Sequence, residues 1–267
     1  MGSEPSDSFY ADRYKVGTGK KIQLKEWVTD EKDKSITQEE GEAILKSDIA
    51  KLSEIQEKLY ASNRYAVLIV IQAMDAAGKD STIKHVMSGL NPQGVNVQSF
   101  KVPTAEELAH DFLWRIHNYA PAKGLIQIFN RSHYEDILVT RVHKLIDDDT
   151  AQKRMKAINN FEELLSENGY TVILKFYLHV SPKEQHERLE ERIKDKTKQW
   201  KYNENDFAEA KLWNEYRNAY EDAFNNCNKI PWTIIPADQN WYKEYLVASS
   251  LCEALKKLHM QYPGLKK

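Results

Sequence analysis

A short loop of small and charged residues, 75–80, carries the clearest chemical signal in this sequence of 267 residues. An apolar segment rich in β-branched residues, 65–72, precedes it and predicts a buried strand, and a polar segment after it predicts the start of a helix. A strand, a tight loop and a helix N-terminus in this order turn backbone N–H groups toward an anion, and Lys79 adds a cation. The order therefore predicts a phosphate-binding loop. Besides Lys79, the residues that we expect to surround the phosphates are Ala76, Ala77, Gly78, Asp80 and Ser81.

The loop departs from the common pattern G-x-x-x-x-G-K-[ST] at two positions, Ala73 and Asp80. The hydroxyl that normally follows the lysine binds Mg²⁺, and the carboxylate of Asp80 cannot act as a neutral hydroxyl. Asp75 offers an alternative oxygen ligand inside the loop. Because a carboxylate beside phosphates is repelled unless a cation lies between them, Asp75 predicts a metal ion, Mg²⁺ with Mn²⁺ as the alternative. Complementing the helix dipole is the competing interpretation of both carboxylates, and we favour it for Asp80.

Polar residues also follow a second predicted strand, 125–129. Asn130 stands where phosphate-binding folds of this kind have an aspartate, and an amide can order a metal-bound water but cannot neutralise Mg²⁺. The charge of the metal would then fall on Asp75, with Glu135 as a second candidate ligand. Arg131 is placed to contact a transferring phosphoryl group. No Ser or Cys nucleophile pattern accompanies His133, which favours hydrogen-bonded packing over catalysis for this histidine.

A charged helical segment later in the chain could contribute further cations. Arg188 and Arg192 are four residues apart, so they share a helix face, within a stretch that holds seven Lys or Arg and five Asp or Glu. On the residues alone, a solvated helix with internal ion pairs is an equally good interpretation. Three other basic residues could extend a positive track, with simple surface placement as the alternative: Lys84, Lys101 and Arg141.

Strands and helices must alternate to position these residues. Alternation with short connections predicts an α/β domain with a mostly parallel sheet and helices on both faces. We expect an extended N-terminal arm over 1–41 with little regular structure, and a single domain over 42–267. The basic residues of the arm could reach a site elsewhere, but keeping the arm solvated is the default interpretation. The predicted strands are 65–72, 95–102, 125–129, 170–180 and 231–235, and the predicted helices include 44–59, 81–90, 104–118, 130–144, 151–167, 182–200 and 241–260.

The composition limits the classes of partner. The formal net charge is -2 and no recognition motif is present, so we do not expect nucleic-acid binding. No apolar run approaches the ~20 residues that span a bilayer, so we expect no membrane partner. Cys227 and Cys252 lack metal-ligand spacing and are typical of free thiols in a cytoplasmic protein.

Several of these segments together resemble the second polyphosphate kinase family, the P-loop polyphosphate kinases. The resemblance covers roughly residues 40–260, in order. The family more often has Lys-Lys where this chain has Gln239-Asn240, so we expect no shared role at those two positions. The segments that carry the resemblance are Asp75-Ala76-Ala77-Gly78-Lys79-Asp80, Ile83-Lys84-His85, Lys101-Val102-Pro103-Thr104, Phe129-Asn130-Arg131-Ser132-His133-Tyr134-Glu135-Asp136, Pro231-Trp232, and Ile235-Pro236-Ala237-Asp238 with Trp241-Tyr242.

The resemblance implies a P-loop kinase-like fold of three layers with a helical lid at about 182–206. It implies reversible, Mg²⁺-dependent transfer of a terminal phosphoryl group from inorganic polyphosphate to adenine nucleotides, with guanine nucleotides as further candidates, and a homo-oligomer. Asn130 and residues 133–136 resemble the family's third class, which acts on both AMP and ADP. Under this interpretation the catalytic groups are Asp75, Lys79, Arg131, Arg188 and Arg192.

Two alternatives remain open from the sequence. An ATP-dependent nucleoside monophosphate kinase would use the same core. A non-catalytic phosphate-binding protein is suggested by the degenerate positions Ala73, Asp80 and Asn130.

Overall fold

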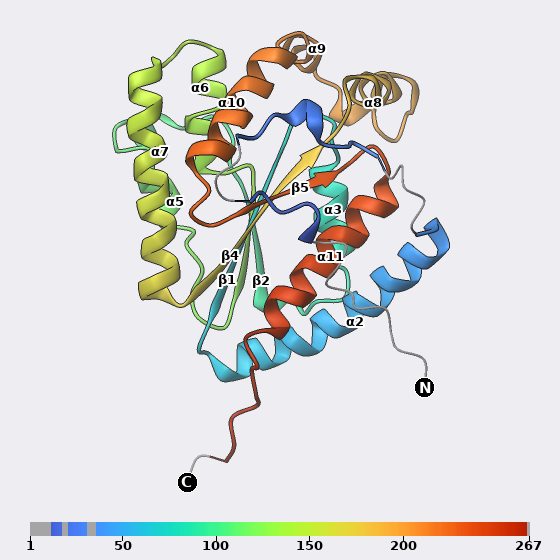
Figure 1. Ribbon diagram of the computed structural model, residues 1–267, viewed down its shortest axis with the longest axis vertical. Helices are drawn as coiled ribbons and strands as arrows, with labels where there is room; N and C mark the ends of the chain where they lie inside the picture. Colours follow the sequence, from blue (N-terminus) through green and yellow to red (C-terminus); the bar gives the residue numbers. More distant parts are fainter. Residues whose placement is uncertain (1–11, 18–20, 31–35, 266–267) are drawn as a thin grey trace.

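Five parallel strands form the central sheet of the computed structural model, which describes residues 12–17, 21–30 and 36–265 (Figure 1). Their order across the sheet is β2-β3-β1-β4-β5. All residues of β1 and β5 are buried, which explains their mostly apolar sequences. The strands are β1 (Ala66–Ala73), β2 (Val95–Ser99), β3 (Ile126–Asn130), β4 (Thr171–His179) and β5 (Trp232–Pro236).

The strand order reverses around β1, which lies between β3 and β4. In an open parallel sheet the carboxyl ends of the strands at such a point border a crevice. Ile71 near the end of β1 pairs in register with Asn130 at the end of β3. The loop after β1 and the polar residues after β3 therefore begin side by side, as the sequence predicts.

Helices cover both faces of the sheet, and the predicted three-layer α/β fold is confirmed (Figure 1). One face carries α2 (Gln38–Ser62), α3 (Lys79–Val86) and α11 (Asn240–Lys256), and α11 packs against both α2 and α3. The other face carries α5 (Trp114–His117), α6 (Val139–Val142), α7 (Asp148–Glu163) and α10 (Trp213–Asn226). Among the described residues, no helix has the length and apolar character needed to cross a bilayer.

The predicted helix over 104–118 is wrong: the chain forms two short helices there, α4 (Ala105–Leu108) and α5. Thr104 and Glu107 do form the expected capping box. In the turn between the two helices, the side chain of Asp111 accepts a hydrogen bond from the backbone N–H of Leu113 at 2.9 Å. Such a local bond offers the backbone an alternative to the helical pattern.

The predicted helix over 130–144 is also broken into η3 (His133–Asp136) and α6. Arg131 has a left-handed φ of 61°, and the Ser132 hydroxyl accepts a hydrogen bond from Tyr134 N at 3.2 Å. Both features turn the chain before a regular helix can begin. The segment predicted as a helix over 151–167 begins earlier, at the start of α7, and continues as a π-helical turn, η4 (Leu164–Asn168).

The predicted arm is not a separate extension where the structure describes it. Tyr14, Val16, Ile22 and Leu24 are buried in the core, and the described part of the arm includes the short helix η1 (Leu24–Glu26). Val16 N donates to Trp232 O at 2.8 Å, so the arm satisfies backbone groups of the edge strand β5. Residues 1–11, 18–20 and 31–35, which include part of the predicted arm, lie outside the described residues.

Candidate active site

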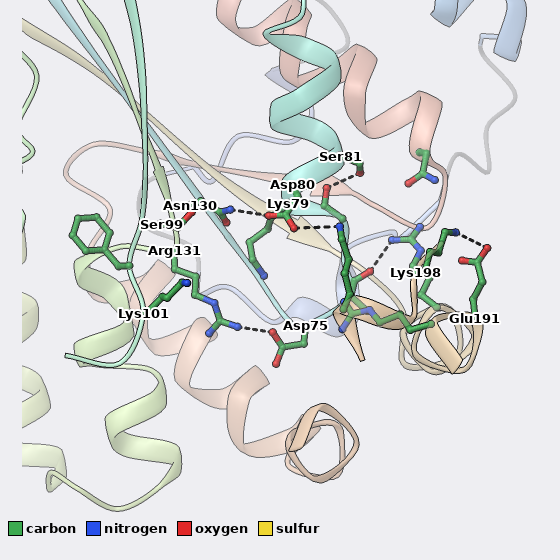
Figure 2. Close-up of a pocket in the computed structure, with 17 residues that line it drawn as sticks. Asp75, Lys79, Asp80, Ser81, Ser99, Lys101, Asn130, Arg131, Glu191 and Lys198 are labelled. Atoms are coloured by element: carbon green, nitrogen blue, oxygen red, sulfur yellow. Dashed lines mark hydrogen bonds and ion pairs between the residues drawn. The ribbon is translucent and has the colours of Figure 1, made fainter. Parts of the chain in front are cut away.

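A cavity of about 490 Å³ opens at the carboxyl ends of β1 and β3, under the segment that begins with α8 (Pro182–Lys194) (Figure 2). Seven Lys or Arg and three Asp or Glu line it, although the whole chain carries a net charge of -2. This local excess of positive charge fits an anion with several negative groups. The cavity is lined by Asp75, Ala76, Gly78, Lys79, Asp80, Ser81, Ser99, Phe100, Lys101, Asn130, Arg131, Arg188, Glu191, Arg192, Lys198, Lys201 and Asn240.

The loop between β1 and α3 has the geometry of a phosphate cradle. Ala76 and Gly78 both adopt left-handed backbone conformations, with φ of 60° and 93°, which turns the loop tightly into the helix N-terminus. Gly78 suits this conformation because it has no Cβ, whereas Ala76 carries strain at the site. Ala77 is fully buried beneath the loop rather than lining the cavity. The hydroxyl of Ser81 donates to Gly78 O at 2.9 Å.

Lys79 points its ammonium back across the loop, where Nζ donates to Ala73 O at 3.1 Å and to Met74 O at 3.3 Å. Burial and the charge of Arg131 lower the pKa of Lys79 to about 8, against the opposing effect of nearby carboxylates, of which Asp75 is the strongest. These two hydrogen bonds to backbone carbonyls therefore fix the position of the Lys79 ammonium. A bound phosphate would supply the negative charge that favours its protonated form.

Arg131 connects the two predicted acidic residues. Its Nη2 donates to Asp75 Oδ1 at 2.6 Å (Figure 2). Its Nη1 donates to Glu135 Oε2 at 3.2 Å. Although burial opposes its charge, the two carboxylates raise the pKa of Arg131 further above its ordinary value. The side chain of Arg131 thus stays charged and is aimed at the loop between two acids.

The residues present fit a magnesium ion that is shared with substrate. The described residues hold no group of three or more His, Cys, Asp or Glu that could bind a metal by themselves. Mg²⁺ is commonly held by one or two carboxylates together with substrate phosphates, so such a group is not required. Asp75 lines the phosphate cavity and its Oδ2 accepts no hydrogen bond among the described residues, so this carboxylate is the best placed ligand.

Two positions where this chain departs from common phosphate-binding patterns, Asp80 in the loop and Asn130 after β3, touch each other. Asn130 Nδ2 donates to Asp80 Oδ1 at 2.8 Å, and Lys201 Nζ lies 3.5 Å from Asp80 Oδ2. Although burial raises it, the pKa of Asp80 is lowered overall by the Asn130 hydrogen bond and by the charges of Lys201 and Lys79. Asp80 also lies in the first turn of α3, where a negative charge is favoured. This carboxylate therefore links the loop, β3 and the lid.

Both predicted arginines of the lid line the cavity, but their donors are largely occupied. Arg188 donates to Glu184 Oε1 at 2.8 Å, to Ala76 O at 3.3 Å, and to the carbonyls of Ala237 and Asp238 at 2.8 and 2.9 Å. It thus ties the lid helix to the phosphate loop and to the turn after β5. Arg192 pairs with Asp206 of α9 (Glu204–Ala210) inside the lid.

Besides Ala77, three predicted residues are not brought into the cavity. Lys84 is exposed on α3 and does not line it. Arg141 is the clearest difference, because it pairs with Asp148 at 2.7 Å and with Asp222 at 3.0 Å on the helical face behind the site. Glu135 lies beside Arg131 but outside the lining of the main cavity. By contrast, Lys101 is placed at the cavity as predicted.

The predicted packing role of His133 is confirmed by its position. The ring is fully buried, and Nε2 lies 3.2 Å from Glu162 Oε1. Burial lowers the pKa of His133, so the ring is neutral. It is not part of the cavity.

The sequence did not single out several residues that line the cavity. Lys198 and Lys201 belong to the charged run of the lid, but helical spacing does not mark them because α8 ends at Lys194. Asn240 comes from the first turn of α11, and only the packing of this helix behind the loop brings it near Gly78. The lining residues that went unpredicted are Ser99, Phe100, Glu191, Lys198, Lys201 and Asn240.

Comparison with known proteins connects this site to a family. The family described as "Polyphosphate kinase 2 (PPK2)" matches residues 35–263. The chain is 50% identical over 215 residues to the AMP/ADP-polyphosphate phosphotransferase of Meiothermus ruber, and the matched region covers 80% of each chain. It is 41% identical over 265 residues to the ADP-polyphosphate phosphotransferase of Rhodopseudomonas palustris, covering 94% of this chain and 91% of that protein.

A solved structure agrees with the sequence matches. The crystal structure of polyphosphate kinase 2 from Arthrobacter aurescens TC1 superimposes with a TM-score of 0.91 at 39% identity, covering 96% of this chain and 92% of the other. Family match, sequence identity and fold thus agree over nearly the whole chain. The chain therefore belongs to the polyphosphate kinase 2 family.

Proposed function

We propose that this protein transfers the terminal phosphoryl group of inorganic polyphosphate to AMP or ADP, reversibly and with Mg²⁺. The observation that carries the proposal is the cavity at the phosphate loop, with seven Lys or Arg in its lining. A phosphate loop with one lysine serves a nucleotide, whereas a chain of phosphates needs cations along its length. The names of the two relatives support both substrate classes.

The chemistry asked of the protein is positioning and charge neutralisation. The acceptor is a phosphate that is already ionised at neutral pH, so no general base is obligatory. Lys79 and Arg131 would hold the transferring group and offset the negative charge of the transition state. Arg188 would keep the lid in register with the loop, so that donor and acceptor meet in line.

Mg²⁺, or Mn²⁺ in its place, would neutralise negative charge between the phosphates when bound, and Asp75 is the residue that would hold it. The lid helices α8 and α9 would exclude water and so limit hydrolysis of polyphosphate. The proposal has three further parts. Guanine nucleotides would serve as additional acceptors, the protein would assemble into a homo-oligomer, and it would be located in the cytoplasm.

One assay tests the proposal directly. The purified full-length chain is incubated with Mg²⁺, polyphosphate and either AMP or ADP, and the nucleotides are separated. We expect ADP or ATP to form only when polyphosphate and Mg²⁺ are both present. Product from AMP and ATP alone would instead favour an ATP-dependent monophosphate kinase, and no product with any donor would favour a binding protein.

Asp75→Asn should lower turnover by about 10²–10³-fold, because it removes a charge that acts where the phosphates react. The variant should unfold at nearly the wild-type temperature, since Asp75 lies at the surface of the cavity rather than in the core. Asp149→Asn provides the matched control, because Asp149 pairs with Lys153 on an exposed helix surface. Wild-type turnover by the Asp75 variant would show that the metal assignment is wrong.

A further inference from the structure

A second lysine lies behind the phosphate loop and has no role in the site described so far. Lys243 of α11 is fully buried. An ideal Cβ built on Gly78 would lie 2.5 Å from Lys243 Nζ, so the ammonium touches the loop from its inner side. Burying an ammonium is costly unless other groups compensate its charge. The position therefore calls for an explanation in terms of the loop.

The hydrogen bond of Lys243 leads into the cavity. Nζ donates to Asn240 Oδ1, one turn earlier on the same helix. A lysine ammonium has donors and no acceptor, so it fixes the amide of Asn240 with the oxygen toward Lys243. The amide nitrogen of Asn240 then faces away from the lysine, and its two N–H groups have no acceptor among the described residues.

Asn240 itself lines the cavity together with Gly78, Ser81 and Arg192. An N–H donor at that place meets the negative oxygens of a bound phosphate chain, and hydrogen bonds to charged groups are stronger than neutral ones. Without the lysine, the amide could rotate and present its oxygen, which repels phosphate. The orientation of Asn240 therefore decides whether this wall of the cavity attracts or repels the ligand.

We propose that Lys243 is a positioning residue that orients the amide of Asn240 as a phosphate-binding donor, so that the first turn of α11 forms a second wall of the phosphate site. The proposal rests on the proposed function for its ligand class, a chain of phosphates. Burial and the neighbouring charge of Arg188 lower the pKa of Lys243 to about 8, with Glu244 and Glu184 opposing them. The ammonium is thus protonated at neutral pH, when it must act as a donor.

The test measures binding of inorganic tripolyphosphate to the full-length chain by calorimetry, without turnover. Asn240→Leu and Lys243→Met should each weaken binding about tenfold. The double variant should bind within twofold of the weaker single variant, because both changes remove the same donor. Lys243→Arg should recover part of the affinity, since arginine also donates to the amide oxygen. Lys257→Met, an exposed lysine beyond the far end of α11, serves as the control.

Several outcomes would overturn this proposal. Wild-type affinity of Asn240→Leu would show that the amide does not bind phosphate. Losses that multiply in the double variant would show that the two residues act independently. Thermal unfolding of each variant identifies misfolding, and the exposed Asn240 variant keeps the test decisive if Lys243→Met does not fold.

The test also separates this proposal from the proposed function. Tripolyphosphate binding by the wild type without transfer to AMP or ADP would overturn the function and leave the Lys243–Asn240 arrangement intact. Normal wild-type turnover with unchanged affinity in both single variants would overturn only this arrangement. Absence of tripolyphosphate binding by the wild type would overturn both.

Discussion

Lys79 shows how one side chain is tuned by burial and by its neighbours. Its ammonium lies among loop carbonyls and close to Arg131, and both burial and that charge lower its pKa to about 8. Asp75 and Glu135 offset part of this effect. A phosphate chain would add negative charge and stabilise the ammonium, so binding and protonation of Lys79 support each other.

Polyphosphate binding should therefore weaken as pH rises through about 8, where Lys79 loses its proton in the free protein. We expect KM for polyphosphate to increase roughly tenfold per pH unit above this value. The reason is that polyphosphate binds to the protonated form of Lys79, so above the pKa each binding event requires the uptake of one proton. Lys79→Arg keeps its charge over this range, so its profile should be flatter even though its geometry is poorer. A KM for the wild type that is constant from pH 7 to 9 would contradict the assignment.

At the scale of elements, one arginine joins three segments. Arg188 binds the carbonyls of Ala76, Ala237 and Asp238, so the lid helix α8, the phosphate loop and the turn after β5 move together. Asp238 Oδ1 also accepts a hydrogen bond from Ser181 N at 2.7 Å at the start of the lid. The lid is thus anchored at its base, while Arg192, Lys198 and Lys201 line the cavity.

Arg188→Lys should lower kcat about 10²-fold with a small change in thermal stability. Lysine keeps the charge but cannot bind three carbonyls at once, and a displacement of about 1 Å at a reacting centre costs rates of this order. Arg217→Lys is the matched control, because Arg217 pairs loosely with Glu221 at 3.9 Å away from the cavity. Retention of full kcat by Arg188→Lys would mean that charge alone suffices at this position.

At the scale of the whole molecule, a buried ion pair joins the layers beneath the site. Lys175 of β4 donates to Glu162 of α7 at 2.7 Å, to Tyr134 Oη at 2.8 Å and to Cys227 O at 2.9 Å. Glu162 also contacts His133, so the network reaches the turn that carries Arg131. Despite burial, the charge of Lys175 keeps the pKa of Glu162 below its ordinary value.

Lys175→Met should destabilise the protein by about 3–5 kcal/mol, because it leaves Glu162 buried without its partner. The double change Lys175→Met with Glu162→Leu should cost less than the single change, since no buried charge then remains. Equilibrium unfolding in urea measures both. A single variant as stable as the double would show that the pair contributes little.

The sequence alone was sufficient for the order of strand, loop and helix that becomes β1, the phosphate loop and α3, although α3 ends at Val86 rather than at residue 90. It also predicted that Asp75, Lys79 and Arg131 lie together at the strand ends, and the structure places all three in the cavity lining. It was insufficient at 104–118, where the side chain of Asp111 accepts a hydrogen bond in the turn between two short helices, and at Arg141, whose acidic partners come from distant segments.

The sequence by itself determined that a strand, a phosphate loop and a helix follow one another, because residues that are close together in the chain form all three. Only the tertiary structure decided that Asn130 binds Asp80, that Arg188 anchors the lid and that Lys243 lies behind Gly78. Each of these contacts joins residues at least 49 positions apart. Packing of helices on the sheet brings such residues together, and patterns over a few neighbouring residues do not predict these long-range contacts.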